Sequence, residues 1–581
     1  MKQLWPFLRR FFAHRRTLLL GYLCIPLSML SDVWITLEVG DAIDRLRESE
    51  RSDFLAGLFW LLLGLGLVRG IFRFLQRRLI VGVSRRVETR LKQDLFDKLT
   101  SLSFSFHNKH LSGDVVSRVT SDVENLRMFL GPGFMYVGGT VVLVPVSMVL
   151  LWNIHWQLAC TMLLPLGLMV VVMKACTPGL HKISTAVQES LALISHRAQE
   201  NFSGVRVVKG YNREESQSAR FAAASRTNRD NQVRLAHMRG MTHAASFGAN
   251  DLTFVVILVV GGLGLLHGEL SPGDVFKFID LTLKVFWPVI ALGWIAGMYP
   301  RAVASARRVQ ELLDEQPEIA DGARTRELAQ VRGELELEDV SFTYPGAERP
   351  ALTGVDLHVP AGTTLGVVGP TGSGKTTLLN LLGRLLEPSG TLKLDGVDVK
   401  DLALATLRGG LGYVPQEAFL FSESYRDNIA FGADHELPDE LLDSLIERSA
   451  MDGEVLEFPN GVEQLIGERG VTLSGGQRQR TCIARALAKN PPVLVLDDCL
   501  SAVDTETEAR LLGNLREAGR GRTVVVAAHR LSSVKNAEHI IVLNESGTVA
   551  ARGTHAELIE SDGWYRDTWQ RQQLREELEE L

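Results

Sequence analysis

Cysteine is scarce in this chain, and the cysteines that occur form no recognisable pattern. There are five in 581 residues, an odd number, and none stands in a Cys-x-x-Cys spacing. Disulfide-rich secreted domains and structural zinc sites both need patterned cysteines, so the sequence argues against both and indicates that the C-terminal half faces a reducing cytosol. The five are Cys24, Cys160, Cys176, Cys482 and Cys499.

An excess of basic charge is also missing, since the formal net charge is −6. Proteins that bind nucleic acid neutralise its phosphates with a clustered basic face. We therefore do not expect nucleic acid as a partner.

Long apolar runs are absent beyond about residue 330 but recur before about residue 300. A helix of about 20 apolar residues crosses a bilayer core of about 30 Å. The basic N-terminus and the length of the first run favour a retained span over a cleaved signal peptide. Six segments meet the length for a span, with approximate bounds 17–39, 54–76, 130–152, 156–176, 243–267 and 274–298.

The connectors between these spans differ in charge and length. Those at 77–129 and 177–242 are long and rich in arginine and lysine, and cytoplasmic connectors carry such an excess. An even number of spans then places both termini in the cytoplasm. The length of these connectors also predicts that their helices continue well beyond the membrane.

Few ionisable residues lie inside the predicted spans, and each is by default a candidate functional residue. Asp280 and Lys284 stand four residues apart on one helical face and can neutralise each other. Arg69 lies near the cytoplasmic end of its span, where a long side chain can extend to the interface. The candidates for a substrate cavity are Asp32, Asp251, Asp280 and Lys284.

A glycine-rich loop in the C-terminal half follows a predicted strand at 364–368 and opens a predicted helix at 378–382. This is the context of a P-loop, whose backbone N–H groups wrap the phosphates of ATP. Lys375 is placed to reach the β- and γ-phosphates, and the Thr376 hydroxyl to ligate Mg²⁺. The motif is Gly369, Pro370, Thr371, Gly372, Ser373, Gly374, Lys375, Thr376 and Thr377.

A second acidic element follows the apolar stretch 492–496. Asp497 would orient the Mg²⁺ shell, and Asp498 is in position to hold the attacking water. The predicted fold class is therefore a membrane all-α six-helix domain fused to an α/β P-loop ATPase domain. We expect the membrane domain at 1–310, a linker at 311–332 and the ATPase domain at 333–581.

The C-terminal half also contains the motif Leu-Ser-Gly-Gly-Gln at 473–477. Together with the P-loop, this motif resembles the signature of ABC (ATP-binding cassette) transporters. We identify the chain as a half-transporter of the multidrug, lipid and peptide exporter family, a resemblance that covers nearly its whole length. Residues 104–107 with 113–114, and 202–209, resemble the family's coupling-helix regions. The signature residues are Leu473, Ser474, Gly475, Gly476 and Gln477.

This resemblance implies a mechanism and further roles. Two half-transporters sandwich two ATP molecules between the P-loop of one and the signature of the other, and closure turns the membrane cavity outward. The location implied is the bacterial cytoplasmic membrane. The resemblance implies that Tyr344 stacks on the adenine, that Gln416 links Mg²⁺ to the membrane domain, and that His529 is a switch that senses the γ-phosphate. It implies that Glu468 couples the ATPase domain to the membrane domain. It also implies that Ser501 and Asp504 belong to a loop, the D-loop, at the contact between the two half-transporters.

Asp498 departs from the family pattern, which normally has glutamate there. A general base must lie within about 2.6–3.2 Å of its proton, and a misplacement of about 1 Å can reduce the rate on the order of 10²-fold. We expect this site to bind ATP but to hydrolyse it poorly. An aspartate at this position together with an intact signature resembles one subunit of the MdlA-like and TmrB-like heterodimeric exporters, the subunit that carries the degenerate site. The resemblance predicts a partner half-transporter that carries the glutamate.

Two other functions are compatible with the same motifs. A homodimer could hydrolyse ATP at two identical sites, and an ATP-gated channel or regulatory subunit would share every motif. An ATPase with a simple membrane anchor is disfavoured, because six spans exceed what anchoring needs. The expected substrates are amphipathic small molecules, lipids or peptides, and the sequence selects none of them.

Overall fold

The computed structural model describes residues 2–48, 54–322, 325–433, 435–467, 470, 472–500, 503 and 505–579. The chain divides into two compact units. The helical unit comprises Met1–Leu99 and Gly113–Asp314, and the α/β unit comprises Thr100–Ser112 and Glu315–Leu581. A helical unit joined to an α/β unit confirms the predicted fold class.

The helical unit is built mainly from five helices of more than 30 residues. Its elements are η1 (Lys2–Leu4), α1 (Trp5–Phe12), α2 (Arg15–Glu48), α3 (Phe54–Ser101), α5 (Ser112–Ser117), η2 (Arg118–Asp122), α6 (Val123–Met128), η3 (Phe129–Gly133), α7 (Phe134–Ile154), α8 (Trp156–Ser203), α9 (Val205–Gly210), α10 (Glu214–Leu266) and α11 (Pro272–Asp314). Of these, η2 and η3 are π-helical turns within one long helical run.

Five helical stretches among the described residues are long and apolar enough to cross a membrane: Arg15–Arg47, Phe54–Ser101, Ser112–Ile154, Glu214–Leu266 and Pro272–Asp314. The remaining predicted span, 156–176, lies in α8, where the side chains of 162–166, 168–170 and 173 are outside the described set. The 53 residues of α10 extend roughly 80 Å, far more than the bilayer core requires. The long connectors are therefore helical, as predicted.

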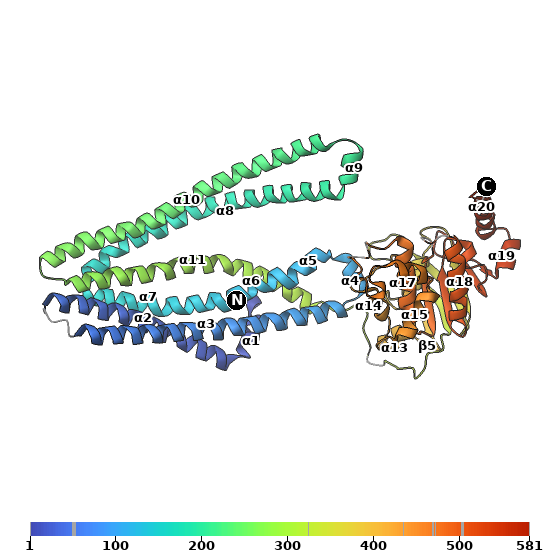
Figure 1. Ribbon diagram of the computed structural model, residues 1–581, viewed down its shortest axis with the longest axis horizontal. Helices are drawn as coiled ribbons and strands as arrows, with labels where there is room; N and C mark the ends of the chain where they lie inside the picture. Colours follow the sequence, from blue (N-terminus) through green and yellow to red (C-terminus); the bar gives the residue numbers. More distant parts are fainter. Residues whose placement is uncertain are drawn as a thin grey trace. The chain divides into compact units, whose positions relative to one another are not determined.

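Within the helical unit, α8 and α10 run side by side and are joined at their far end by α9 (Figure 1). The apolar packing between spans centres on Val33, Leu158, Ile257, Phe278 and Leu281. Close approach also depends on glycine: a Cβ on Gly131 would lie 2.5 Å from the Cβ of Ser84 on α3. A glycine at this position thus allows the third predicted span to pack tightly against α3.

The described residues of the α/β unit form two sheets. The larger has the order β10-β9-β3-β8-β7-β6, in which only β10 is antiparallel, and the smaller is antiparallel with the order β2-β1-β4-β5. The strands are β1 (Leu335–Phe342), β2 (Leu352–Val359), β3 (Thr364–Val368), β4 (Ser389–Leu394), β5 (Val397–Asp398), β6 (Leu411–Val414), β7 (Val493–Asp497), β8 (Thr523–Ala527), β9 (His539–Leu543) and β10 (Val549–Gly553).

The helices of this unit pack on the sheets and carry most of the motifs. They are α4 (Phe104–Lys109), α12 (Lys375–Leu382), α13 (Leu404–Gly409), α14 (Tyr425–Ala430), α15 (Asp439–Arg448), α16 (Asp452–Glu457), η4 (Gly461–Glu463), α17 (Gly475–Ala488), α18 (Thr505–Gly519), η6 (Leu531–Ser533), α19 (His555–Glu560) and α20 (Trp564–Glu579).

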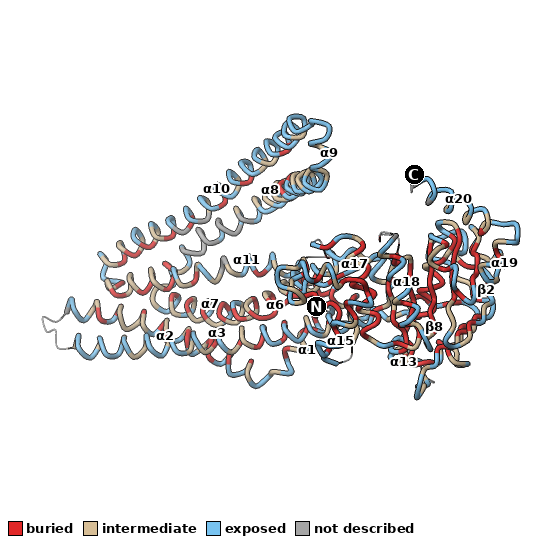
Figure 2. The backbone as a smooth tube through the Cα atoms, turned by 45° about the vertical axis from the view of Figure 1, so that its right-hand side comes forward, coloured by how far each residue is buried: buried red, intermediate tan, exposed pale blue. Residues whose placement is uncertain are grey.

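The centre of the larger sheet is the most buried part of the unit (Figure 2). All residues of β7 and β8 are buried, which is typical of parallel strands covered on both faces. Because β3, β7 and β8 are parallel neighbours, their carboxyl ends meet at one edge. That edge gathers the P-loop, the acidic pair and His529, and such an edge is where open α/β sheets bind ligands.

Candidate nucleotide-binding site

The P-loop runs from the end of β3 to the start of α12, and its turns require glycine. Gly369 has φ 152° and Gly374 has φ 94°. A Cβ on Gly369 would lie 2.3 Å from the carbonyl oxygen of Leu543, and one on Gly374 would lie 2.4 Å from that of Ala351. The loop therefore has both the backbone conformation and the close packing that exclude side chains at these two positions.

Lys375 begins α12 and turns back over the loop. Its Nζ donates hydrogen bonds to the carbonyl oxygens of Gly369 at 2.9 Å and Pro370 at 3.0 Å, and the residue is only 7% exposed. Burial lowers the pKa of Lys375, while the nearby charges of Asp498 and Asp497 act in the opposite direction. The ammonium group is thus held at the centre of the loop, where a bound phosphate would replace the carbonyl oxygens as its partner.

The residues predicted to hold Mg²⁺ lie together. The Thr376 hydroxyl donates to Oδ1 of Asp497 at 3.2 Å, and Asp497 is 1% exposed. Its Oδ2 has no hydrogen-bond partner among the described residues, and neither has the buried Oγ of Ser373. Burial raises the pKa of Asp497, the Thr376 hydrogen bond opposes this, and the charge of Asp498 adds to the rise.

An unpartnered carboxylate oxygen beside a threonine hydroxyl fits a hard cation, which prefers oxygen ligands. The residues present therefore suit ATP with Mg²⁺. Gln416 follows β6, the neighbour of β7, and its side chain is exposed at the same edge of the sheet.

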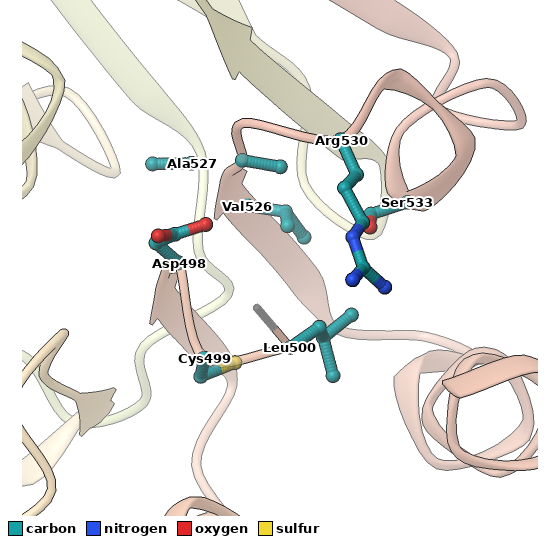
Figure 3. A pocket seen from close by; sticks show the side chains of 8 residues that line it. Asp498, Cys499, Leu500, Val526, Ala527, Arg530 and Ser533 are labelled. Carbon is teal, nitrogen blue, oxygen red and sulfur yellow. The ribbon is translucent and has the colours of Figure 1, made fainter. Parts of the chain in front are cut away.

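Asp498 has a left-handed backbone conformation, with φ 42°. Its N–H donates to the carbonyl oxygen of Ala527 at 2.9 Å, and its Oδ1 lies 3.4 Å from the N–H of His529. Figure 3 shows the small pocket beside it, lined after β7 by Asp498, Cys499 and Leu500 and after β8 by Arg530 and Ser533. The carboxylate therefore lies next to the backbone of the loop that carries the predicted switch histidine.

The predicted adenine-stacking residue, Tyr344, is 39% exposed. Its hydroxyl is 3.1 Å from Oγ1 of Thr377, which fixes the ring to the P-loop helix. Tyr344 also lines a cavity of about 540 Å³ together with residues of α4 and its flanks, including Phe106 and His110. The first coupling-helix region thus lies beside the predicted base-binding position.

The segment around α4 is hydrogen-bonded to the α/β unit. The Ile319 N–H donates to Oγ of Ser103 at 2.9 Å, and the Ser105 hydroxyl donates to the carboxylate of Glu318. This explains why 100–112 belongs to the α/β unit although it is flanked by helical-unit residues in the sequence.

The signature motif forms the start of α17. Ser474 is the N-cap: its Oγ accepts the N–H of Gln477 at 3.2 Å, and Oε1 of Gln477 accepts the N–H of Ser474 at 2.8 Å. Gly475 and Gly476 are the first helical residues, and Leu473 is buried beneath the motif. A capped helix N-terminus whose first residues lack bulky side chains can admit an anion such as a γ-phosphate.

Three predicted site residues, Glu468, Ser501 and Asp504, lie outside the described residues. Two residues that the sequence did not single out, Glu508 and Gln572, bind the loop that follows His529. Their contacts join segments 22 to 43 residues apart, so no local motif could have indicated them.

Three of the four cavity candidates in the spans come together. Nζ of Lys284 lies 2.8 Å from Oδ2 of Asp280 and 3.2 Å from Oδ1 of Asp32. Asp251, on α10, is exposed and has no ion pair with another described residue. The spacing-based prediction that Asp280 and Lys284 neutralise each other agrees with this geometry.

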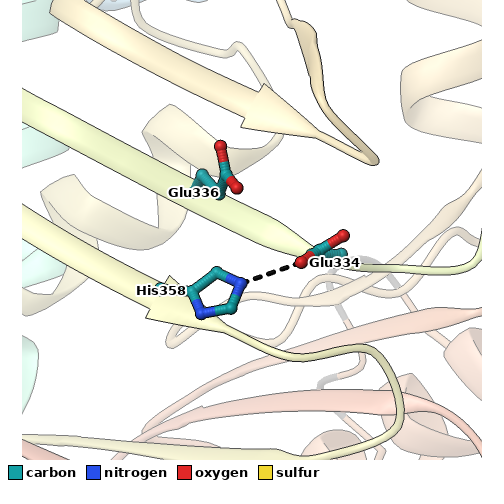
Figure 4. Close-up of side chains that lie close together, drawn as sticks. All are labelled: Glu334, Glu336 and His358. Atoms are coloured by element: carbon teal, nitrogen blue, oxygen red, sulfur yellow. Dashed lines mark hydrogen bonds and ion pairs between the residues drawn. The ribbon is translucent and has the colours of Figure 1, made fainter.

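A separate acidic and imidazole cluster lies on the smaller sheet. His358 Nε2 is 2.8 Å from Glu334, and Glu336 stands opposite His358 in the register of β1 and β2 (Figure 4). Lys393 is 3.2 Å from Glu336 and 2.6 Å from Glu338, so part of this negative charge is already neutralised. The cluster is separate from the P-loop and serves as ordinary cross-strand pairing.

Comparison with known proteins agrees with these observations. Residues 18–289 match the model of the ABC transporter transmembrane region, and 352–501 match the ABC transporter model. The chain is 33% identical over 548 residues to the multidrug resistance-like ATP-binding protein MdlA of Escherichia coli K12, covering 93% of this chain and 92% of that protein. It is 32% identical over 569 residues to the ATP-dependent lipid A-core flippase of Vibrio vulnificus CMCP6, covering 97% and 96%.

A solved structure shares the whole architecture. A bacterial Atm1-family ABC exporter with ATP bound superposes with a TM-score of 0.76 and 26% identity, covering 97% of this chain and 98% of that one. With the membrane region, the P-loop and the signature all present, the chain belongs to the ABC transporter family and is an ABC exporter with its transmembrane region and ATPase domain on one polypeptide.

Proposed function

We propose that this chain is the ATP-holding half of a heterodimeric exporter in a bacterial cytoplasmic membrane. It forms a nucleotide site of low hydrolytic activity and contributes its signature motif to the active site of a second half-transporter. Six spans then cross the membrane, with both termini and the ATPase domain in the cytoplasm. The observation that carries the proposal is Asp498, at the position of the general base.

Two features of Asp498 support a weak site. Its side chain is one methylene shorter than glutamate, and its Oδ1 is already directed to the His529 N–H of its own chain at 3.4 Å. A base that cannot reach within about 2.6–3.2 Å of the attacking water loses on the order of 10²-fold in rate. The binding residues of the P-loop do not share this defect, so ATP would stay bound.

The signature and the tip of the α8–α10 hairpin support a partner half-transporter. Ser474 caps α17 by accepting the N–H of Gln477 and is exposed, so the motif is accessible to a nucleotide held by another chain. At the hairpin tip, Phe202 and Tyr211 are each 77% exposed on either side of α9. Exposed aromatic residues of this kind suit docking against another protein surface, and we assign that surface to the partner's ATPase domain.

In this mechanism the residues of the chain bind and orient the nucleotide. Lys375 neutralises phosphate charge, Tyr344 stacks on the base, and Ser474 with Gln477 contacts the γ-phosphate held by the partner. Thr376, Asp497 and Gln416 would hold Mg²⁺, which when bound neutralises charge on the β- and γ-phosphates. His529 senses the γ-phosphate. Each ATP adds contacts only in the closed dimer and so shifts the equilibrium toward closure.

The proposed cargo is amphipathic: small molecules, lipids or peptides leaving the cytoplasm or the inner leaflet. The named relatives include a multidrug resistance-like ATP-binding protein and an ATP-dependent lipid A-core flippase, and these names support drug-like and lipid substrates for this chain. The paired charges of Asp32, Asp280 and Lys284 offer both signs within the spans.

The test compares ATP hydrolysis by the purified chain alone and after reconstitution with a candidate partner that carries the glutamate. We expect little turnover alone, robust turnover in the complex, and a further increase with Asp498→Glu. Robust turnover by the chain alone that Asp498→Asn abolishes would instead establish a homodimer with two active sites. ATP-dependent uptake into inside-out vesicles, measured beside conductance, distinguishes export from an ATP-gated channel.

A further inference from the structure

The C-terminal helix holds the loop that carries the switch histidine. The side chain of Gln572, on α20, forms two hydrogen bonds with this loop. Its Nε2 donates to the carbonyl oxygen of His529 at 2.9 Å, and its Oε1 accepts the N–H of Leu531 at 2.9 Å. One carboxamide thus fixes the backbone on both sides of Arg530.

The same loop is fixed on another side by α18. Glu508 is 4% exposed, and both of its oxygens are used: Oε1 accepts the hydroxyl of Ser533 at 2.8 Å, and Oε2 pairs with Arg530 at 2.5 Å. α18 therefore holds the side chains of Arg530 and Ser533, while α20 holds the backbone at His529 and Leu531, so both helices fix the loop.

The first half of α20 is anchored to α19, and this anchoring fixes the position of Gln572. Tyr565 is buried, and its hydroxyl lies 2.7 Å from Nδ1 of His555 on α19. The ring of Trp569 stands edge-on to His555, with centroids 4.6 Å apart. Beyond Gln572 the helix changes character, since Leu574 and Leu578 are exposed. Gln572 therefore lies near the end of the anchored part of α20 and contacts the loop at the nucleotide edge.

We propose that Gln572 is a positioning residue for His529, so that the C-terminal helix sets how well this ATPase domain distinguishes ATP from ADP. The inference rests on the proposed role of His529 as the γ-phosphate sensor. A backbone held at the carbonyl of His529 and at the N–H of Leu531 fixes the direction in which the imidazole projects. Without Gln572 the imidazole would reach the γ-phosphate in only a fraction of the molecules.

The test measures binding of a non-hydrolysable ATP analogue and of ADP to the full-length chain in lipid nanodiscs. Gln572→Met has nearly the same length but cannot form either hydrogen bond. We expect it to reduce the preference for the ATP analogue over ADP about tenfold, the size expected for two lost hydrogen bonds. Gln572→Glu keeps the acceptor for the Leu531 N–H but places a carboxylate oxygen next to the His529 carbonyl oxygen, which it repels. The preference for the ATP analogue over ADP should therefore fall by at least as much.

The matched control is Gln573→Met, on the exposed neighbouring position of the same helix. It should leave the preference unchanged. The double variant His529→Ala with Gln572→Met should show no more loss than His529→Ala alone, because the two residues act as one unit. Additive losses, or an equal loss of affinity for both nucleotides, would overturn the positioning role and leave Gln572 as a structural contact.

The two proposals fail in different ways. If His529→Ala itself leaves the preference for the ATP analogue unchanged, the sensor role within the proposed function is wrong. If His529→Ala removes the preference and Gln572→Met does not, only the role of Gln572 is wrong. Thermal unfolding of each variant identifies one that fails to fold, and the Gln572→Glu variant then carries the test.

Discussion

Arg69 on α3 and Asp32 on α2 form an ion pair of 2.8 Å between two predicted spans. Asp32 also pairs with Lys284 on α11, which pairs in turn with Asp280, and Thr36 donates to Asp280 at 2.5 Å. Two acidic and two basic side chains thus form one neutral network across three helices. In a hydrocarbon environment such charges are tolerated when they are paired.

The network predicts that leaving one charge without its partner lowers stability more than removing both charges of a pair. Lys284→Met leaves two carboxylates with a single cation. Because the pair is only partly buried, with side chains 17% and 32% exposed, the loss of stability should lie between the values for exposed and buried pairs, about 1–3 kcal/mol. Lys284→Met combined with Asp280→Asn leaves the neutral pair of Asp32 and Arg69. We expect the single variant to have the lower thermal midpoint in nanodiscs and the double variant to recover most of the loss. Equal midpoints would show that the network contributes no electrostatic stability.

The ion pair also marks the limit of prediction from the sequence. Asp280 and Lys284 are predicted to pair because they are four residues apart on one helix, and a helix fixes that geometry locally. Arg69 is expected to extend to the interface, yet it binds Asp32, 37 residues away, because α2 and α3 are adjacent in the fold. The partner of a charge in another helix depends on helix packing, which no local pattern encodes.

The same distinction applies to the nucleotide site. The P-loop and the acidic pair are each defined within a few consecutive residues next to an apolar strand, so the local pattern located them. The signature was identified by its resemblance to the family motif, which is also a short run of residues. Glu508 and Gln572 are an ordinary glutamate and glutamine on polar helices, and only the packing of α18 and α20 brings them to the loop after His529. The left-handed conformation of Asp498 is likewise a property of the folded sheet edge.

The P-loop glycines predict that alanine substitutions weaken ATP binding to different degrees at different positions. At Gly374 a Cβ would meet the Ala351 carbonyl oxygen at 2.4 Å, whereas at Gly372 a Cβ meets nothing within 4 Å and only the φ of 84° is unfavourable. Gly374→Ala should therefore weaken ATP binding by more than tenfold. Gly372→Ala should cost only the conformational strain, about 1 kcal/mol or roughly fivefold. Nucleotide titration of both variants checks this order, and the reverse order would show that the space at Gly374 is not limiting.

Ser474, the N-cap of the signature helix α17, predicts an effect on ATP turnover that appears only when the partner half-transporter is present. Ser474→Ala removes the hydroxyl that accepts the Gln477 N–H, a loss of about 1 kcal/mol for an N-cap. The same change removes a contact to the partner's ATP, so turnover of the complex should fall by at least tenfold. Nucleotide binding to this chain alone should be unchanged, because its own P-loop is intact. Loss of binding by the chain alone would contradict the assignment of the signature to the partner's site.

The contact between α19 and α20 predicts a loss of stability at mildly acidic pH. Burial lowers the pKa of His555, and the charge of Lys535 lowers it further. Nδ1 of the ring forms a 2.7 Å hydrogen bond with the Tyr565 hydroxyl, whose own pKa burial raises to about 12. The folded protein therefore binds a proton at His555 less readily than the unfolded chain, whose histidines titrate near pH 6.5.

It follows that the stabilisation is present above about pH 6.5 and is lost as the pH falls toward the folded pKa of His555. Thermal unfolding of the full-length protein, followed between pH 7.5 and 5.5, should show the midpoint decreasing across this range. His555→Gln has no titrating group at this position, so its midpoint should depend less steeply on pH whatever its value at pH 7.5. If both proteins lose stability with the same slope, protonation of His555 does not control the docking of α20, and the pH dependence arises elsewhere in the chain.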